Sequence, residues 1–259
     1  MVAMVTALVT GGTSGIGAAF ARAFAERGEN LVLVARDQTR LDETAESLRQ
    51  AYGVEVETVS ADLSDRADVV RVAEVLSRET NPIGVLVNNA GFGIHTPLLA
   101  EDTAPHERAL DVMGRAVLML GAAAGRGMRT RGTGTIINIS SVAGYITMGS
   151  YSAIKAWVTS YTEGLAVELK GSGVQVTALC PGWVHTEFHE RAGIRESSIP
   201  NFLWIDVDEL VADCLADVAK GKVISIPSGR FKFLTFFTRH LPRSTIRAIS
   251  GRISSSRSH

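Results

Sequence analysis

A tyrosine and a lysine stand four positions apart at Tyr151 and Lys155, and the serines Ser140 and Ser141 precede them. Residues i and i+4 share one face of a helix, so this spacing predicts a phenol beside an ammonium group. A phenol with an ordinary pKa near ~10 is a weak acid, and a neighbouring ammonium lowers that pKa. A ketone that accepts a hydride needs such a proton donor at its oxygen, together with hydrogen-bond support. The alternative is an ordinary polar helix face.

A glycine cluster, "TGGTSGIG" at 10–17, stands between an apolar strand pattern at 5–10 and a helical pattern at 15–28. Glycines permit a tight turn, a close backbone approach to a pyrophosphate and close packing of helix on strand. The start of the helix then offers free amide groups to the phosphates. The segment therefore predicts a dinucleotide site, and a tight turn without a ligand is the alternative. The residues assigned to this site are Gly11, Thr13, Ser14, Gly15, Ile16 and Gly17.

The residue after the second predicted strand, 30–35, indicates which dinucleotide is bound. A carboxylate there binds the ribose 2′-hydroxyl of NAD, whereas an arginine accommodates the 2′-phosphate of NADP. Arg36 comes first and is followed by Asp37, with Arg40 one turn further on. The planar guanidinium matches phosphate geometry, so NADP(H) is favoured over NAD(H). The alternative is a solvated Arg36 with Asp37 as the helix N-cap.

Short β-branched runs alternate with amphipathic segments of helical length along the chain. This repetition predicts a parallel sheet with helices on both faces, in one domain without an internal linker. The predicted strands are 5–10, 30–35, 54–62, 84–91, 134–141, 174–182 and 222–227. The predicted helices are 15–28, 37–53, 65–79, 101–131, 151–173 and 206–221. Only the end of the chain, 250–259, is expected to be weakly ordered.

Bulk composition excludes several other functions. The 259 residues are 46% apolar and 20% charged, which is typical of a soluble globular protein. A net charge of −1 gives no indication of nucleic-acid binding. The first residues lack a signal-peptide pattern, and no apolar run is long enough to span a membrane. Cys180 and Cys214 lie far apart in apolar contexts, so a reducing, cytoplasmic setting is expected.

Four segments in order, "TGGTSGIG", "NNAG" (88–91), "YSAIK" (151–155) and "PGWVHT" (181–186), resemble the short-chain dehydrogenase/reductases over about residues 5–226. The resemblance implies one Rossmann-type domain, 1–228, with a doubly wound seven-stranded parallel sheet, and a basic C-terminal extension, 229–259. It also implies a homodimer or homotetramer. The tail resembles that of 3-oxoacyl reductases from actinobacteria and of long-chain 3-oxoacyl reductases, though less closely.

The resemblance also assigns roles to residues. It implies that Ser141 orients the carbonyl, with Ser140 as the alternative, while Tyr151 and Lys155 complete the catalytic set and Lys155 also holds the nicotinamide ribose. Asp62 and Leu63 would meet the adenine, although Asp62 could instead cap a helix. The segment 88–91 would line the cofactor and stabilise the sheet. The alternative is that these residues are present only because they form a turn. The remaining implied cofactor contacts are Asn89, Ala90, Gly91, Pro181, Gly182, Val184 and Thr186.

One position departs from the family pattern. Members usually have an asparagine in a "DVNxxG" stretch, where it supports a water that links the lysine to solvent. This chain reads "DVMGR" at 111–115, with Met113 at that position. Methionine cannot form those hydrogen bonds. Three outcomes stay open: a relay through backbone and water alone, slow turnover, or loss of catalysis.

The segments beyond the core indicate the kind of substrate and partner. His185 and His189 are four apart, but Thr186 replaces the glutamate that a zincin needs, so no metal is expected. The resemblance implies a substrate loop in this segment, and its residues would make that lid apolar, which suits a hydrophobic substrate. The lid residues are Trp183, Phe188, Phe202, Leu203 and Trp204. The aromatic and basic segment 231–252 could contact an anionic membrane, an acidic carrier group such as phosphopantetheine or CoA, or another subunit.

Together these patterns predict an NADPH-dependent carbonyl reductase for an apolar ketone or an acyl substrate such as a 3-oxoacyl chain. Tyr151 would supply the proton. Two alternatives stay open: a dinucleotide-binding protein with weak or no catalysis, and a dehydrogenase of steroid or other alcohols. The apolar lid argues against sugars.

Overall fold

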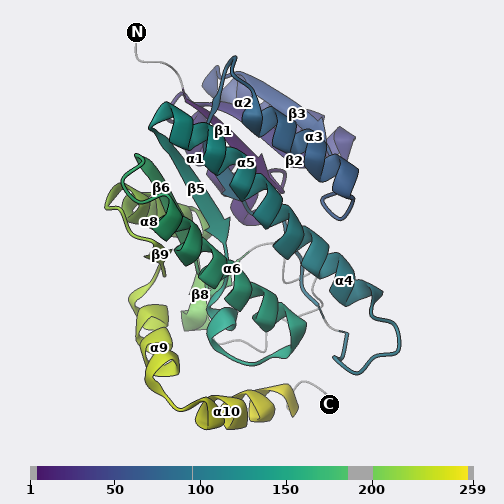
Figure 1. The fold of residues 1–259 in the computed structure, drawn as a ribbon, viewed down its shortest axis with the longest axis vertical. Helices are drawn as coiled ribbons and strands as arrows, with labels where there is room; N and C mark the ends of the chain where they lie inside the picture. Colours follow the sequence, from purple (N-terminus) through teal and green to yellow (C-terminus); the bar gives the residue numbers. More distant parts are fainter. Residues whose placement is uncertain (1–4, 95, 186–200, 256–259) are drawn as a thin grey trace.

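The computed structural model describes residues 5–94, 96–185 and 201–255, and these contain a parallel seven-stranded sheet (Figure 1). The strand order is β3-β2-β1-β4-β5-β6-β9, which confirms the predicted doubly wound fold. The strands of this sheet are β1 Thr6–Thr10, β2 Asn30–Ala35, β3 Val56–Ser60, β4 Ile83–Asn88, β5 Gly134–Ile139, β6 Val174–Leu179 and β9 Ile224–Ser225. A separate parallel pair, β7 Trp183–Val184 and β8 Trp204–Ile205, was not predicted.

Helices cover both faces of the sheet. On one face α1, α2 and α8 pack with residues such as Phe20, Leu41 and Leu210, and on the other α3, α5 and α6 pack with Val72, Leu120 and Ile154. The helices are α1 Gly15–Ala25, α2 Gln38–Tyr52, α3 Arg66–Ser77, α4 Ala104–Leu110, α5 Ala116–Arg131, α6 Gly149–Glu168, α8 Val207–Ala219, α9 Gly229–His240 and α10 Arg243–Ser255. The 3-10 helices are η2 Val142–Tyr145 and η4 Asn201–Leu203. The central strands are buried throughout because both faces are covered, which explains their continuous apolar runs.

Three predicted boundaries need correction. The expected helix 101–131 is interrupted by a π-helical turn, η1, at Asp111–Arg115. The last strand is only two residues long, within the predicted 222–227. The segment 250–255, expected to be weakly ordered, belongs to α10, which follows α9 after a break at Leu241 and Pro242. Among the described residues, no helix is both long and apolar enough to cross a membrane.

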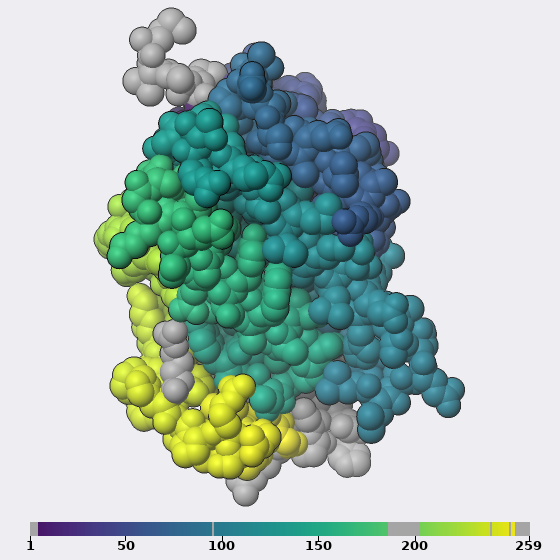
Figure 2. Space-filling view, viewed as in Figure 1, coloured from purple at the N-terminus to yellow at the C-terminus, as the bar shows by residue number. Residues whose placement is uncertain are grey.

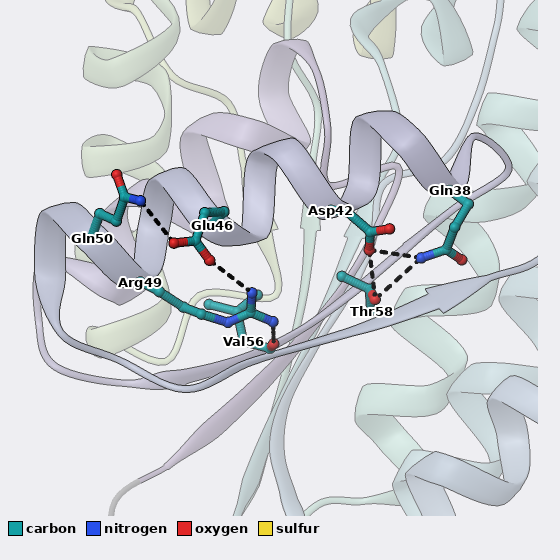
Figure 3. A network of polar contacts seen from close by, with 7 residues as sticks. All are labelled: Gln38, Asp42, Glu46, Arg49, Gln50, Val56 and Thr58. Atoms are coloured by element: carbon teal, nitrogen blue, oxygen red, sulfur yellow. Dashed lines mark hydrogen bonds and ion pairs between the residues drawn. The ribbon is translucent and has the colours of Figure 1, made fainter.

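The outer side of α2 is fixed to the edge strand β3 by polar contacts (Figure 3). Asp42 accepts hydrogen bonds from Gln38 at 2.7 Å and from Thr58 at 3.3 Å, so one carboxylate joins the helix to the strand. Further along, Arg49 contacts Glu46 and donates to the Val56 carbonyl. The Asp42 contacts hold the first turn of α2, which follows the end of β2 where Arg36 lies, and the Arg49 contacts hold its last turn.

A buried chain of amides and a hydroxyl connects two strands to α6. Asn88 at the end of β4 donates to Asn138 of β5 at 2.9 Å, and Asn138 donates to Thr162 of α6 at 3.0 Å. All three side chains are buried. Because an unpaired buried amide is costly, this chain of partners fixes α6 in one register against the sheet.

Candidate active site

The turn between β1 and α1 has no room for a side chain at two of its glycines. Gly11 has a left-handed φ of +65°, and a β-carbon there would lie 2.9 Å from the Asn89 amide nitrogen. A β-carbon on Gly17 would overlap the Gly11 carbonyl oxygen. Ser14 is the N-cap of α1 in an extended conformation, and its side chain makes no capping hydrogen bond. The α1 amides therefore face a turn that is open to an anion, as the sequence pattern predicts.

Thr10 is a contact residue that the sequence reasoning did not identify. Its hydroxyl accepts hydrogen bonds from the backbone N–H groups of Asn89 at 2.9 Å and Ala90 at 3.0 Å. The Asn89 side chain in turn donates to the carbonyls of Thr10 at 2.9 Å and Gly11 at 3.2 Å. These bonds join the ends of β1 and β4 directly beneath the glycine turn. The only sequence signal was a hydroxyl-bearing residue at the end of an apolar strand.

Arg36 is exposed at the end of β2. Asp37 caps α2, because its carboxylate accepts a hydrogen bond from the Arg40 backbone N–H at 3.1 Å. The capping alternative is thus correct for Asp37. It leaves the Arg36 guanidinium in solvent at the position where a ribose 2′-substituent is expected.

The Asp62 carboxylate, which lies just after β3, makes hydrogen bonds and an ion pair with other residues of the protein. It accepts hydrogen bonds from the Ser64 N–H at 3.0 Å and hydroxyl at 2.7 Å, and pairs with Arg108 at 2.8 Å. Partial burial raises the pKa of Asp62, but these hydrogen bonds and the Arg108 charge outweigh it and hold the pKa below its ordinary value. Leu63 is buried in the core beside it. The predicted adenine contacts therefore lie at the carboxyl end of β3, with Asp62 ionised and already hydrogen-bonded.

The two serines after β5 have different environments. The Ser140 hydroxyl is buried and donates to the Lys155 carbonyl at 2.7 Å, with Thr159 also at 2.7 Å. The Ser141 hydroxyl instead accepts from the Ala143 N–H at 3.1 Å and hydrogen-bonds the Tyr151 side chain. Ser140 thus anchors α6 to the sheet, and Ser141 is the serine beside the tyrosine.

Tyr151 and Lys155 lie on the same face of α6, as their spacing predicts. The Lys155 ammonium is 5.6 Å from the centre of the Tyr151 ring and donates to the Ile139 carbonyl at 2.8 Å. Lys155 is only 5% exposed, whereas Tyr151 is half-buried. The sheet edge, Ser141 and the first two turns of α6 therefore bring a hydroxyl, a phenol and an ammonium group together.

The pKa of the phenol differs from the sequence-based expectation. Burial raises the pKa of Tyr151 to about 12, although the Ser141 hydrogen bond lowers it in part. Burial also lowers the pKa of Lys155 to about 8. Loss of hydration therefore dominates over the ammonium charge that was expected to acidify the tyrosine. At neutral pH the phenol holds its proton firmly and Lys155 remains mostly charged.

Met113 lies inside the π-helical turn η1 and is fully buried. Its sulfur would lie 3.0 Å from a β-carbon on Gly91, so the thioether packs against the residue that ends the 88–91 segment. A π-helical turn inside a long helix often marks a functional position. The departure from the family pattern therefore coincides with a local change of helix geometry.

The segment after β6 lies between the candidate site and α9. The Pro181 carbonyl accepts from the Val142 N–H at 3.0 Å, and Gly182 lies against the ring of Phe231. Val184 is buried in β7 and pairs with Ile205. The predicted site residue Thr186 and the lid residue Phe188 lie outside the described residues, as does His189.

The described part of the lid is an aromatic cluster. The rings of Trp183 and Trp204 are 6.3 Å apart, and His185 stacks on Trp204 at 4.4 Å. Leu203 is half-buried and packs with the core, and Phe202 is exposed. The described residues contain no group of three metal-ligating side chains placed to hold an ion.

Comparison with known proteins agrees with this geometry. A model of the short chain dehydrogenase family matches residues 5–196. A very-long-chain 3-oxoacyl-CoA reductase of Anas platyrhynchos is 38% identical over 189 residues, which cover 70% of this chain and 60% of that protein. A gluconate 5-dehydrogenase of Gluconobacter oxydans is 31% identical over 239 residues, or 86% of this chain and 93% of that protein.

Among solved structures, a short-chain dehydrogenase from Sphingobium yanoikuyae in complex with NADPH superposes with a TM-score of 0.83. It is 38% identical, and the match covers 91% of this chain and 94% of that one. The relatives named here differ in substrate, so they agree on a fold and a reaction class.

Proposed function

Since the chain belongs to the short-chain dehydrogenase family, and is thus an NAD(P)-dependent dehydrogenase or reductase, we propose that it is an NADPH-dependent reductase of apolar ketones. A 3-oxoacyl chain is the first candidate substrate. The observation that carries this proposal is the contact of Ser141 with Tyr151, with the Lys155 ammonium behind the ring.

The residues of the glycine turn fit a dinucleotide. Gly11 and Gly17 leave the turn without β-carbons, and the first amides of α1 lie beside it. Arg36 would hold the 2′-phosphate and Asp62 the adenine end, while Asn89, Ala90, Pro181, Gly182 and Val184 would border the rest. Bound there, the reduced nicotinamide supplies the hydride.

Side chains of the protein would bind the carbonyl oxygen of the substrate and supply its proton. Ser141 donates a hydrogen bond to that oxygen and places it beside Tyr151. Tyr151 then transfers its proton as negative charge develops on the oxygen. A phenol with a raised pKa is fully protonated at neutral pH, and Lys155 stabilises the phenolate that remains.

The proposed class of substrate, an apolar ketone, is inferred from the apolar residues of the predicted lid. Trp183, Leu203 and Trp204 form an aromatic and aliphatic wall after the Pro181–Gly182 segment. An apolar wall favours a ketone flanked by hydrocarbon over a sugar. The very-long-chain 3-oxoacyl-CoA reductase among the relatives supports this preference, although the gluconate 5-dehydrogenase shows that a related chain acts on a polar substrate.

The direct test is Tyr151→Phe, which removes the proton donor and keeps the ring. We expect NADPH oxidation with an apolar ketone to fall by about 10²–10⁴-fold, while NADPH binding measured by fluorescence is unchanged. Tyr161→Phe, on the same helix, is the matched control and should retain activity. Full activity of Tyr151→Phe would exclude this mechanism.

The second candidate function is a dinucleotide-binding protein with slow turnover, and one observation favours it, the buried thioether of Met113 in the π-helical turn. Met113→Asn restores the family's usual amide at that place. A rise in kcat of tenfold or more, with NADPH binding unchanged, would show that Met113 limits proton supply. If wild-type turnover is already fast and Met113→Asn leaves it unchanged, this candidate is excluded.

We further propose that the chain forms a homo-oligomer through the outer side of α4, α5 and α6. Leu110, Leu118 and Trp157 are exposed there and line a hollow of about 220 Å³. Light scattering after gel filtration tests this, because Leu118→Arg should produce smaller species. An unchanged mass of that variant would contradict the proposal.

A further inference from the structure

Helix α9 has its aromatic side chains on the outside. Phe231 and Thr235 face the protein and are buried. Phe233, Phe236 and Phe237 are 65%, 57% and 45% exposed. An ordinary surface helix shows the reverse, with polar residues outward. The inversion indicates that this face has a partner other than water.

The exposed rings form one continuous patch. Phe233 and Phe237 are 4.7 Å apart between ring centres, and Phe236 lies 5.8 Å from Phe237. His240 continues the row at 4.3 Å from Phe236, and Leu234 is also exposed. Contiguous apolar surface of this kind marks an interaction site, whereas scattered exposed residues do not.

Basic residues surround the patch. Arg230 and Lys232 flank it on α9, and Arg243 and Arg247 are exposed on α10. After Asp217 the sequence contains no aspartate or glutamate. An aromatic face between long cationic side chains is the pattern of a helix lying in the plane of an anionic membrane surface, with the charged ends near the headgroups.

The same charges argue against a second copy of the chain as the partner. A two-fold contact centred on α9 would place the basic residues of one copy against those of the other, with no carboxylate from this segment to offset them. A soluble acidic group would match the charge but would leave the three phenylalanines in water. We propose that α9 and α10, the C-terminal arm, dock the protein on the surface of an anionic lipid bilayer.

The arm is attached to the candidate active site. The Phe231 ring packs on Gly182, and Ser250 of α10 accepts a hydrogen bond from the Thr147 N–H at 3.2 Å. Thr147 lies in the connection between Ser141 and Tyr151. Figure 1 shows α9 and α10 beside the amino-terminal end of α6, and Figure 2 shows them as a ridge along that end of the molecule. Docking therefore holds the Tyr151 end of the fold toward the lipid.

Vesicle flotation with the full chain tests the docking directly, without cofactor or substrate. We expect binding to vesicles of phosphatidylcholine with 30 mol% phosphatidylglycerol, weaker binding in 0.5 M NaCl, and little binding to phosphatidylcholine alone. The triple variant F233S/F236S/F237S should bind at least about a hundredfold less. Lys232→Glu, Arg243→Glu and Arg247→Glu should each reduce binding by about fivefold or more.

Matched controls separate docking from general surface effects. L99S/V167S removes two exposed apolar side chains elsewhere, and R126E/R129E/K170E reverses three exposed charges on α5 and after α6; both should bind vesicles like the wild type. All variants should keep the wild-type Tm. Absence of wild-type flotation, equal binding to neutral vesicles, or a change of the triple phenylalanine variant from oligomer to monomer would overturn the proposal. Reduction of a water-soluble ketone by these variants reports on the proposed catalysis separately.

Discussion

The glycine turn after β1 and the C-terminal arm both lie at the carboxyl ends of the strands, but they are built in opposite ways. The turn is held by hydrogen bonds between β1 and β4: the Thr10 hydroxyl accepts from the Asn89 N–H, and the Asn89 side chain donates to the Thr10 carbonyl. No space remains there for a β-carbon on Gly11 or Gly17. The arm rests on a few inward side chains, Phe231, Thr235, Ile246 and Ser250, and exposes the rest. The proposed phosphate site leaves no room for an added side chain, whereas the proposed docking surface needs only a few buried side chains to hold it in place.

The largest effect is expected for Gly17→Ala in the glycine turn. The new methyl group would overlap the Gly11 carbonyl and the Asn89 amide, so the turn must open. We expect NADPH affinity to fall by more than about a hundredfold and stability by about 1–3 kcal/mol, measured by fluorescence titration and urea unfolding. Gly164→Ala is the matched control, because a β-carbon there meets nothing within 4 Å. Normal NADPH binding by Gly17→Ala would show that the turn is not the phosphate site.

On the arm, the corresponding test contrasts two phenylalanines two positions apart. Phe231→Ala removes a buried ring from Gly182 and should lower the free energy of unfolding by about 3 kcal/mol. Phe233→Ala removes an exposed ring and should change it by less than about 0.5 kcal/mol. Urea unfolding measures both. Equal losses would mean that the outward face is covered within the protein itself.

Arg36→Ala sharpens the assignment of the cofactor. Loss of a charge-assisted contact to the 2′-phosphate should weaken NADPH by about 10–100-fold and leave NADH almost unchanged. Competition of each nucleotide in a ketone-reduction assay measures the ratio. Arg27→Ala, also exposed but at the opposite, amino-terminal end of β2, should leave the ratio unaltered. A parallel loss for both nucleotides would argue against NADP selectivity at this position.

The smallest predicted effect concerns pH. Burial lowers the pKa of Lys155 to about 8 from 10.5, so between pH 8 and 10 the unfolded chain binds more protons than the folded chain. Stability should therefore rise with pH in this window, by about 1 kcal/mol between pH 8 and 9. Lys155→Met should lack this increment. Unfolding in urea at both pH values compares the two, and an identical slope would exclude a buried ammonium.

The sequence predicted the repetitive part of the molecule well because its signals are local. The strand 30–35 and the glycine pattern of the turn can be recognised from neighbouring residues, and the pairing of Tyr151 with Lys155 follows from helical spacing alone. The choice of Ser141 over Ser140 came from the family pattern and agrees with the hydrogen bonds.

What the sequence did not predict depends on contacts between distant segments. Thr10 meets Asn89 across 79 positions, and Phe231 meets Gly182 only after the sheet is complete. The pKa of Tyr151 was expected to fall, but burial, which no spacing reveals, moves it upward. The π-helical turn at 111–115 was not predicted either, and its Met113 packs against Gly91, 22 positions away.

The buried chain from Asn88 through Asn138 to Thr162 has a consequence for engineering and divergence. It joins β4 and β5 to α6, the helix that carries Tyr151, with no contribution from α9 or α10. Substitutions of the exposed residues of those two helices can therefore accumulate without loosening this link. Libraries confined to the exposed positions of α9 and α10, with Phe231, Thr235, Ile246 and Ser250 kept, should yield altered partners and substrates at a high fraction of folded, active clones.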